Sequence, residues 1–159
     1  MRQNGGNMDI KLPGRGMTNI KNLIFDFNGT LTENRKLSEA GREVLETLSQ
    51  KYAVYVATSD TFGNAKEELK GLNVKIVTVK SGSEKLELVM KLGYASTIAI
   101  GNGNNDKSML KKAVVGIAVI GRDGATPDAI NSADIVIGNI KNIIPLLKNR
   151  DLIFSVLRK

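Results

Sequence analysis

The sequence predicts a single α/β domain built on a doubly wound parallel sheet. Short apolar runs alternate with segments of helical periodicity along most of the 159 residues. The runs are apolar throughout, which is typical of strands that are buried on both faces of a parallel sheet. No Ser/Pro-rich linker or charged block divides the chain, so we expect one domain over residues 8–159 after a flexible N-terminal extension at 1–7.

The elements of the first half are predicted from apolar runs, helical spacing and glycine breaks. An alternating segment at 8–12 predicts a short edge strand, and the apolar run at 22–27 predicts the first core strand. Apolar residues recur at helical spacing over 37–48, with Ser38 as the predicted N-cap. Next come a strand at 52–57, a helix at 62–70 and a strand at 74–79.

The second half continues the alternation of helices and strands. Helical spacing predicts a helix over 83–92 that Gly93 ends, and the apolar strand at 97–100 leads into a Gly/Asn-rich loop at 101–106. The remaining predicted elements are a helix at 107–113, strands at 116–120 and 135–137 with a helix at 125–132 between them, and closing helices at 139–147 and 152–157.

The chain contains neither cysteine nor histidine, and this removes whole classes of chemistry. Without cysteine there is no disulfide framework, thiolate nucleophile or thiolate metal site. Without histidine there is no Ser-His-Asp triad and no His-bound zinc. Acid–base and metal chemistry must therefore use Asp, Glu, Lys, Tyr and backbone groups.

The net charge of +7 suits an anionic ligand. Lysine and arginine are scattered, however, and aromatic residues make up only 4% of the chain, which argues against nucleic acid as a partner. The polar N-terminus has no apolar signal-peptide core, and the longest apolar run, at 113–120, is too short to span a bilayer. We therefore expect a cytoplasmic protein without a membrane partner.

Polar side chains follow several predicted strands at the points where these strands end. Asp26 ends the first core strand, Thr58 follows the second, and the loop at 102–106 follows a later one. Because the carboxyl ends of parallel strands meet at one edge of a sheet, we expect these groups to converge there. Lys85, near the start of a predicted helix, reaches the same edge.

These groups are the parts that a site for phosphate and magnesium requires. Magnesium prefers hard oxygen ligands, and phosphoryl oxygens need a cation and directed donors. A carboxylate can also accept the phosphoryl group covalently. Each residue has a purely structural alternative, since Asp26 can cap a turn and Lys85 can lie in solvent. Their order and their position at strand ends favour the functional interpretation.

The order of these motifs resembles that of the haloacid dehalogenase (HAD) superfamily. Over residues 8–158 the similarity rests on Asp26-Phe27-Asn28-Gly29-Thr30, Thr58, Lys85 and Gly101-Asn102-Gly103-Asn104-Asn105-Asp106. Gly29-Thr30-Leu31-Thr32 also resembles part of the phosphorylation motif in the catalytic P domain of P-type ATPases, and the chain looks like a soluble P-type ATPase-like hydrolase. The resemblance implies a HAD-like Rossmannoid fold and a magnesium-dependent phosphohydrolase.

The resemblance also implies residue roles. Asp26 is the implied nucleophile that forms an aspartyl-phosphate, and Thr58 and Lys85 bind the phosphoryl group. The implied catalytic residues are Asp26, Lys85, Thr58 and Asn28; the implied substrate-binding residues are Phe27, Asn28, Thr58, Ser59, Lys85 and Asn105; and the implied Mg²⁺ ligands are Asp26, Asn28, Asn102 and Asp106. Whether Asn102 or Asp106 contacts the metal directly stays open.

Two positions depart from the family pattern. Typical HAD phosphatases have an aspartate where this chain has Asn28, and that aspartate acts as general acid and base. General acid–base catalysis of this kind increases the reaction rate by roughly 10²–10⁴-fold, so we expect slow turnover without it. Asn102 replaces the usual first aspartate of the loop, which predicts weaker magnesium binding.

The spacing of the motifs leaves no room for a cap domain. Thr58 follows Asp26 by 58 − 26 = 32 residues, and Lys85 follows Thr58 by 85 − 58 = 27 residues. One turn and one helix fill the first interval, and one helix and one strand fill the second. We therefore expect an open, capless site that admits a phosphorylated small molecule or macromolecule, or that another subunit of a homo-oligomer closes.

Two other functions compete with a phosphohydrolase. The neutral residues at Asn28 and Asn102 suit a non-catalytic or regulatory module that binds phosphate and magnesium. A phosphoacceptor receiver domain also uses Asp, Thr, Lys and magnesium. Its acceptor lies mid-chain beside an N-terminal acidic pair, whereas Asp26 lies on the first core strand and precedes Gly29-Thr30.

Overall fold

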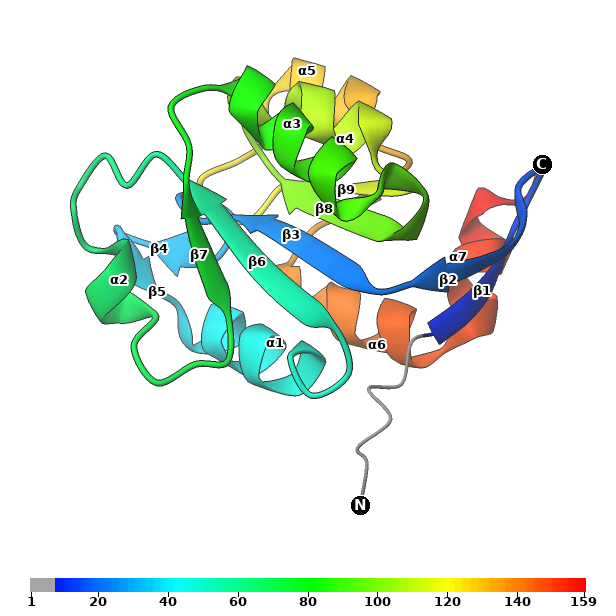
Figure 1. Ribbon diagram of the computed structural model, residues 1–159, viewed down its shortest axis with the longest axis horizontal. Coiled ribbons are helices and arrows are strands. Elements are labelled where there is room, and N and C mark those ends of the chain that lie inside the picture. The colour runs from blue at the N-terminus through cyan, green and yellow to red at the C-terminus, as the bar shows by residue number, and fades with distance from the viewer. Residues whose placement is uncertain (1–7) are drawn as a thin grey trace.

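A computed structural model describes residues 8–159 and contains a central parallel sheet of six strands (Figure 1). The strands follow the order β10-β9-β8-β3-β6-β7 across the sheet. They comprise β3 (Asn22–Asp26), β6 (Ala53–Thr58), β7 (Lys75–Thr78), β8 (Thr97–Gly101), β9 (Val115–Val119) and β10 (Ile135–Ile137). The predicted doubly wound parallel sheet is confirmed. The predicted extension at 1–7 lies outside the described residues.

The strand order reverses between β3 and β8. From β3 the chain adds β6 and β7 on one side and then returns to add β8, β9 and β10 on the other. In open α/β sheets, ligands bind outside the carboxyl ends of the strands at such a switch point. The ends of β3 and β8 are therefore where the fold favours a site.

Helices cover both faces of the sheet (Figure 1). One face carries α3 (Gly82–Leu92), α4 (Lys107–Lys112) and α5 (Pro127–Ser132), and the other carries α1 (Glu39–Leu48) and α6 (Ile143–Lys148). Every residue of β3 is buried, and its side chains alternate between the two layers. Leu23 and Phe25 join the larger apolar cluster with α1, whereas Ile24 joins the smaller cluster with α3 and α4.

The N-terminal segment forms a hairpin rather than a lone edge strand. β1 (Met8–Leu12) pairs antiparallel with β2 (Gly16–Ile20), and α7 (Arg150–Leu157) packs against β1. The prediction missed β2, because Gly16 to Ile20 alternates weakly and most of its residues are not fully buried. Its pairing with β1 completes the strand, and no local pattern reveals such a partner.

The connections around the site differ most from the prediction. A second hairpin joins β4 (Thr32–Glu33) to β5 (Lys36–Leu37), and the helix predicted at 62–70 is only α2 (Ala65–Glu68). The helix is short because Asp60 and Gly63 have positive φ angles and Asn64 makes no side-chain cap. Three short 3₁₀ turns complete the described chain: Tyr94–Ser96, Asn104–Asp106 and Ile140–Asn142.

No additional domain interrupts residues 8–159. Between β3 and β6 lie only the β4–β5 hairpin and α1, and between β6 and α3 lie only α2 and β7. The capless architecture expected from the spacing is confirmed. Within the described part of the chain, none of the helices is long and apolar enough to cross a membrane.

Candidate active site

Asp26 lies at the carboxyl edge of the sheet, between the ends of two neighbouring strands. In the parallel register, Asp26 pairs with Ala57 of β6, one residue before Thr58. On the other side Phe25 pairs with Ile100 of β8, so the loop that begins at Gly101 lies beside Asp26. The predicted convergence of strand ends is therefore built by the register of β6, β3 and β8.

Lys85 joins Asp26 to Asp106 in a buried charge cluster. Its Nζ lies 2.7 Å from Asp26 Oδ1 and 2.7 Å from Asp106 Oδ1, and its side chain is only 1% exposed. Ser81 caps the N-terminus of α3 and so fixes the helix turn that carries Lys85. The solvent-exposed alternative for Lys85 therefore does not hold.

Burial and charge act in opposite directions in this cluster. Burial, followed by the charge of Asp106, raises the pKa of the Asp26 carboxyl from 3.8 to about 7, although Lys85 favours its ionised form. Burial disfavours the Lys85 ammonium, but the adjacent Asp26 and Asp106 outweigh this effect and raise its pKa. The cluster therefore holds a positive charge beside Asp26, where a phosphoryl group would bring negative charge.

Both carboxylate oxygens of Asp106 accept hydrogen bonds from other groups of the protein. Oδ1 accepts from Lys85, and Oδ2 accepts from the backbone N–H groups of Asn102 and Gly103 at 3.0 Å and 2.9 Å. The carboxylate is completely buried. These three donors orient Asp106 toward Lys85 and the loop. The geometry therefore favours Asp106 as the residue that positions Lys85, and it leaves Asn102 as the loop residue that could hold a metal.

Asn102 is fixed so that its amide oxygen points toward Thr30, which also contacts Asp26. Its Nδ2 donates to the Gly124 carbonyl at 3.1 Å, and its Oδ1 accepts from Thr30 Oγ1 at 3.2 Å. An aspartate at this position would set an oxygen against the Gly124 carbonyl, which needs a donor. The departure from the family pattern at Asn102 thus has a local structural cause.

Thr30 connects the two sides of the site, and the sequence-based set of site residues did not include it. The same hydroxyl lies 3.4 Å from Asp26 Oδ2 and 3.2 Å from Asn102 Oδ1, so these two oxygens converge. Gly29 permits the Asn102 side chain to lie close to the backbone of this turn, since Gly29 has a φ of +80° and a Cβ there would lie 2.4 Å from Asn102 Nδ2. The Gly-Thr pair after the aspartate was the signal that could have identified Thr30.

The residues present fit a magnesium ion. Asn28 Oδ1 is buried without a hydrogen-bond partner in the described structure, and Thr30, two residues further on, contacts both Asp26 Oδ2 and Asn102 Oδ1. Residues 8–159 contain no cluster of three or more Asp, Glu, His or Cys side chains that could hold a metal. Magnesium commonly uses one or two carboxylates and completes its shell with water and substrate phosphate. A site with few acidic ligands and several neutral oxygens suits that behaviour.

The remaining predicted residues occupy different positions. Thr58 is buried at the sheet edge, and its Oγ1 accepts from the backbone N–H of Asp60 at 2.9 Å. The Phe27 side chain is fully buried in the core, so only its backbone can face a substrate. Ser59 is exposed and lies 2.7 Å from the Thr61 hydroxyl, and Asn105 is exposed on the loop after β8. The structure does not bring Ser59 or Asn105 into contact with Asp26.

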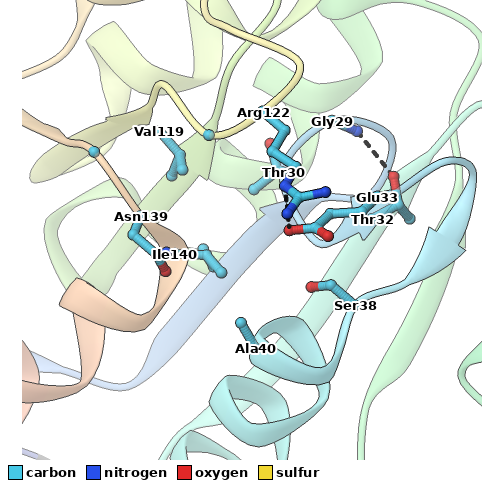
Figure 2. Close-up of a pocket in the computed structure, with 12 residues that line it drawn as sticks. Gly29, Thr30, Thr32, Glu33, Ser38, Ala40, Val119, Arg122, Asn139 and Ile140 are labelled. Atoms are coloured by element: carbon cyan, nitrogen blue, oxygen red, sulfur yellow. Dashed lines mark hydrogen bonds and ion pairs between the residues drawn. The ribbon is translucent and has the colours of Figure 1, made fainter.

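Two pockets open beside the turn that follows Asp26. The larger, of about 390 Å³, is lined by Gly29, Thr30 and residues of the hairpin, of α1 and of the loop after β9 (Figure 2). Arg122 reaches across to Glu33, with 3.8 Å between Nε and Oε1. A second pocket, of about 270 Å³, shares Gly29 and Thr32 with it and extends past Asn28. Two pockets therefore adjoin the turn that follows Asp26.

The pKa of Asp26 predicts how the stability of the metal-free protein depends on pH. The pKa of Asp26 is about 7 in the folded chain and 3.8 in an unfolded one. The stabilisation that protonated Asp26 contributes to the folded state is therefore fully present below pH 3.8 and is lost as pH rises through about 7. The free energy of unfolding should fall by roughly 2–4 kcal/mol over this range. Urea unfolding in EDTA checks this, and equal pH slopes for the wild type and Asp26→Asn would contradict it.

The fold and the site together define a Rossmann-like α/β domain with a buried Asp–Lys–Asp cluster at the switch point of its sheet. A profile of haloacid dehalogenase-like hydrolases matches residues 80–143. An uncharacterised protein of Methanocaldococcus jannaschii is 42% identical over 85 residues, covering 49% of this chain and 91% of the relative. The chain belongs to the haloacid dehalogenase-like hydrolases, and the family predicted from its motifs is confirmed.

Other comparisons extend this similarity. The phospholipid-transporting ATPase ID of Mus musculus is 32% identical over 112 residues, which cover 63% of this chain but only 9% of the ATPase. Among solved structures, 3-deoxy-D-manno-octulosonate 8-phosphate phosphatase from Moraxella catarrhalis superposes with a TM-score of 0.66 at 18% identity, covering 86% of this chain and 87% of that one. The second similarity concerns the fold, which both chains share over nearly their full lengths.

Proposed function

We propose that this protein is a magnesium-dependent phosphatase that acts through an aspartyl-phosphate at Asp26. The observation that carries the proposal is the buried contact of 2.7 Å between Lys85 Nζ and Asp26 Oδ1, at the switch point of the sheet. A carboxylate held beside a buried cation can attack a phosphoryl group while that cation neutralises the phosphoryl charge. The phosphatase from Moraxella catarrhalis, which shares this fold, was solved in complex with magnesium, phosphate and a KDO molecule, which supports this class of reaction.

The residues of the chain have distinct tasks in this reaction. An Asp26 carboxylate oxygen attacks phosphorus, and the bond from phosphorus to the leaving oxygen breaks. Water then attacks the aspartyl-phosphate, which releases inorganic phosphate and restores Asp26. Lys85 and the Thr58 hydroxyl hold the phosphoryl oxygens, and Asp106 keeps Lys85 in place through its contact of 2.7 Å. Asn28 offers no titrating group, so the leaving oxygen must take its proton from water.

The residues that would hold magnesium are Asp26, the backbone carbonyl of Asn28 and the amide oxygen of Asn102. Bound magnesium would neutralise charge on the phosphoryl oxygens and orient them toward Asp26. Asp106 is committed to Lys85 and to two backbone N–H groups, and so supports the metal site indirectly. With one carboxylate in direct contact, affinity for magnesium should be weak in the absence of substrate.

Removal of divalent metal is expected to abolish hydrolysis of para-nitrophenyl phosphate. The protein is dialysed against EDTA, and phosphate release is measured as magnesium is added back. We expect no turnover without metal and recovery that saturates with magnesium. Full activity in EDTA would contradict a metal-dependent mechanism.

A non-catalytic phosphate-binding module is the second candidate, because Asn28 and Asn102 are both neutral at positions where the family has acids. The two functions differ in a single experiment. A module binds beryllium fluoride in a magnesium-dependent way but releases no phosphate from any substrate. An enzyme does both, and a panel of phosphorylated metabolites, nucleotides and phosphoproteins then identifies its preferred substrate.

A further inference from the structure

A pocket of about 270 Å³ is lined by Asn28 and Gly29, which belong to the turn that follows Asp26. Its walls include Arg35 from the hairpin tip, Phe62 from the loop after β6 and Asp123 from the loop after β9. Because the pocket adjoins the turn that follows Asp26, it is placed to receive the part of a substrate that extends from a phosphoryl group at Asp26. Its lining therefore bears on which substrates fit.

Arg35 occupies an unfavourable backbone conformation at the tip of the β4–β5 hairpin. Asn34 and Arg35 have φ angles of 51° and 67°, so both residues of the two-residue turn are left-handed. Turns of this kind favour Asn followed by Gly, since a side chain at the second position is strained. An arginine at a position where glycine would be less strained indicates that the arginine side chain has a function.

The guanidinium of Arg35 is held over an aromatic ring. Its Cζ lies 4.4 Å from the centroid of the Phe62 ring. Asn64 Nδ2 donates to the Arg35 carbonyl at 2.6 Å, and Glu68 accepts from the backbone N–H of Leu37 at 2.9 Å. These bonds tie the hairpin to the segment around α2, which lies beside it in Figure 1. The guanidinium is therefore positioned before any ligand arrives.

The stacked guanidinium has no acidic partner. None of the ion pairs found within residues 8–159 includes Arg35. Stacking uses the flat face of a guanidinium and leaves its edge N–H groups for a planar anion. Asp123 also lines the pocket but forms no ion pair with Arg35 in the described structure, and because its carboxylate repels an anion, an anionic group belongs at Arg35.

We propose that this pocket receives the leaving group of the substrate and that Arg35 binds a second anionic group on it, a carboxylate or a second phosphate. The inference rests on the proposed phosphatase function and narrows its substrates to phosphomonoesters with two separated anionic groups. A charge-assisted, bidentate contact of this kind changes affinity by roughly tenfold at an exposed site.

The test compares two substrates of the same shape and different charge. Para-carboxyphenyl phosphate carries the second anion, and para-carbamoylphenyl phosphate is its neutral counterpart; hydroquinone bisphosphate supplies a second phosphate instead of a carboxylate. We expect the wild type to prefer an anionic substrate over the neutral one by roughly tenfold in kcat/KM. In Arg35→Gly the ratio should fall to about one, while thermal stability should not decrease because glycine relieves the strained turn.

Lys36→Gln is the matched control, because it removes one positive charge from the same hairpin at a residue outside the pocket. It should keep the wild-type ratio. The same substrates titrated onto Asp26→Asn report binding without turnover, so a preference in affinity is measurable even if the proposed catalysis fails. A ratio of about one in the wild type, an unchanged ratio in Arg35→Gly, or an equal loss in Lys36→Gln would overturn the inference.

Discussion

Asp26→Asn is expected to abolish hydrolysis of an aryl phosphate, with turnover falling by roughly 10⁴-fold or more. The amide is similar in size and retains an oxygen for Lys85, but it cannot attack phosphorus. Because the amide also removes a buried carboxylate whose pKa is raised to about 7, the variant should remain folded. Release of phosphate from para-nitrophenyl phosphate with saturating magnesium measures the effect.

Asp128→Asn is the control for this loss, because it makes the same chemical change at a carboxylate whose side chain is 56% exposed and pairs only with the exposed Lys107. Its turnover should equal that of the wild type. Activity of Asp26→Asn within tenfold of the wild type would exclude Asp26 as the nucleophile.

Asn28→Asp is expected to raise turnover by roughly 10²–10⁴-fold, which is the usual contribution of a general acid–base group. The Asn28 side-chain oxygen is buried and has no hydrogen-bond partner within the described residues, so the position can accept a proton-bearing oxygen without losing a bond. The gain should be largest for alkyl phosphates, whose leaving oxygens need a proton most. Single-turnover kinetics separates formation of the phosphoenzyme from its hydrolysis.

Asn102→Asp supplies the contrast, since it makes the same substitution on the opposite side of Thr30. Here the amide nitrogen donates to the Gly124 carbonyl, so the variant loses a bond and sets two oxygens against each other. It should be less stable and should not reproduce the acceleration. An unchanged or slower rate in Asn28→Asp would show that a missing acid does not limit turnover.

The sheet and the centre of the site were predictable because both depend on local sequence. Strands that are buried on both faces have continuously apolar sequences, and Asp26 lies at the end of such a sequence. The parallel topology then brings strand ends together, which places Asp26 near Thr58 and the loop after β8. The family, the parallel sheet and the absence of a cap within residues 8–159 are confirmed on this basis.

The parts that were missed depend on pairing between distant segments. The sequence leaves open whether Asp106 contacts a metal or Lys85, because Lys85 is 21 residues away from it in the chain. The hairpin with Arg35 at its tip has strands of only two residues, too short for a periodic pattern. Its position over Phe62 follows from the bonds to Asn64 and Glu68, which only the folded chain brings together.

Trapping of the covalent intermediate tests the assignment of Asp26 most directly. The protein is mixed with magnesium and acetyl phosphate, quenched in acid, and digested for mass spectrometry of the peptide that contains Asp26. We expect one phosphoryl group on Asp26, accumulating because Asn28 cannot activate water, and none in Asp26→Asn. Turnover without a phosphorylated Asp26 peptide, or phosphorylation at another residue, would contradict the mechanism.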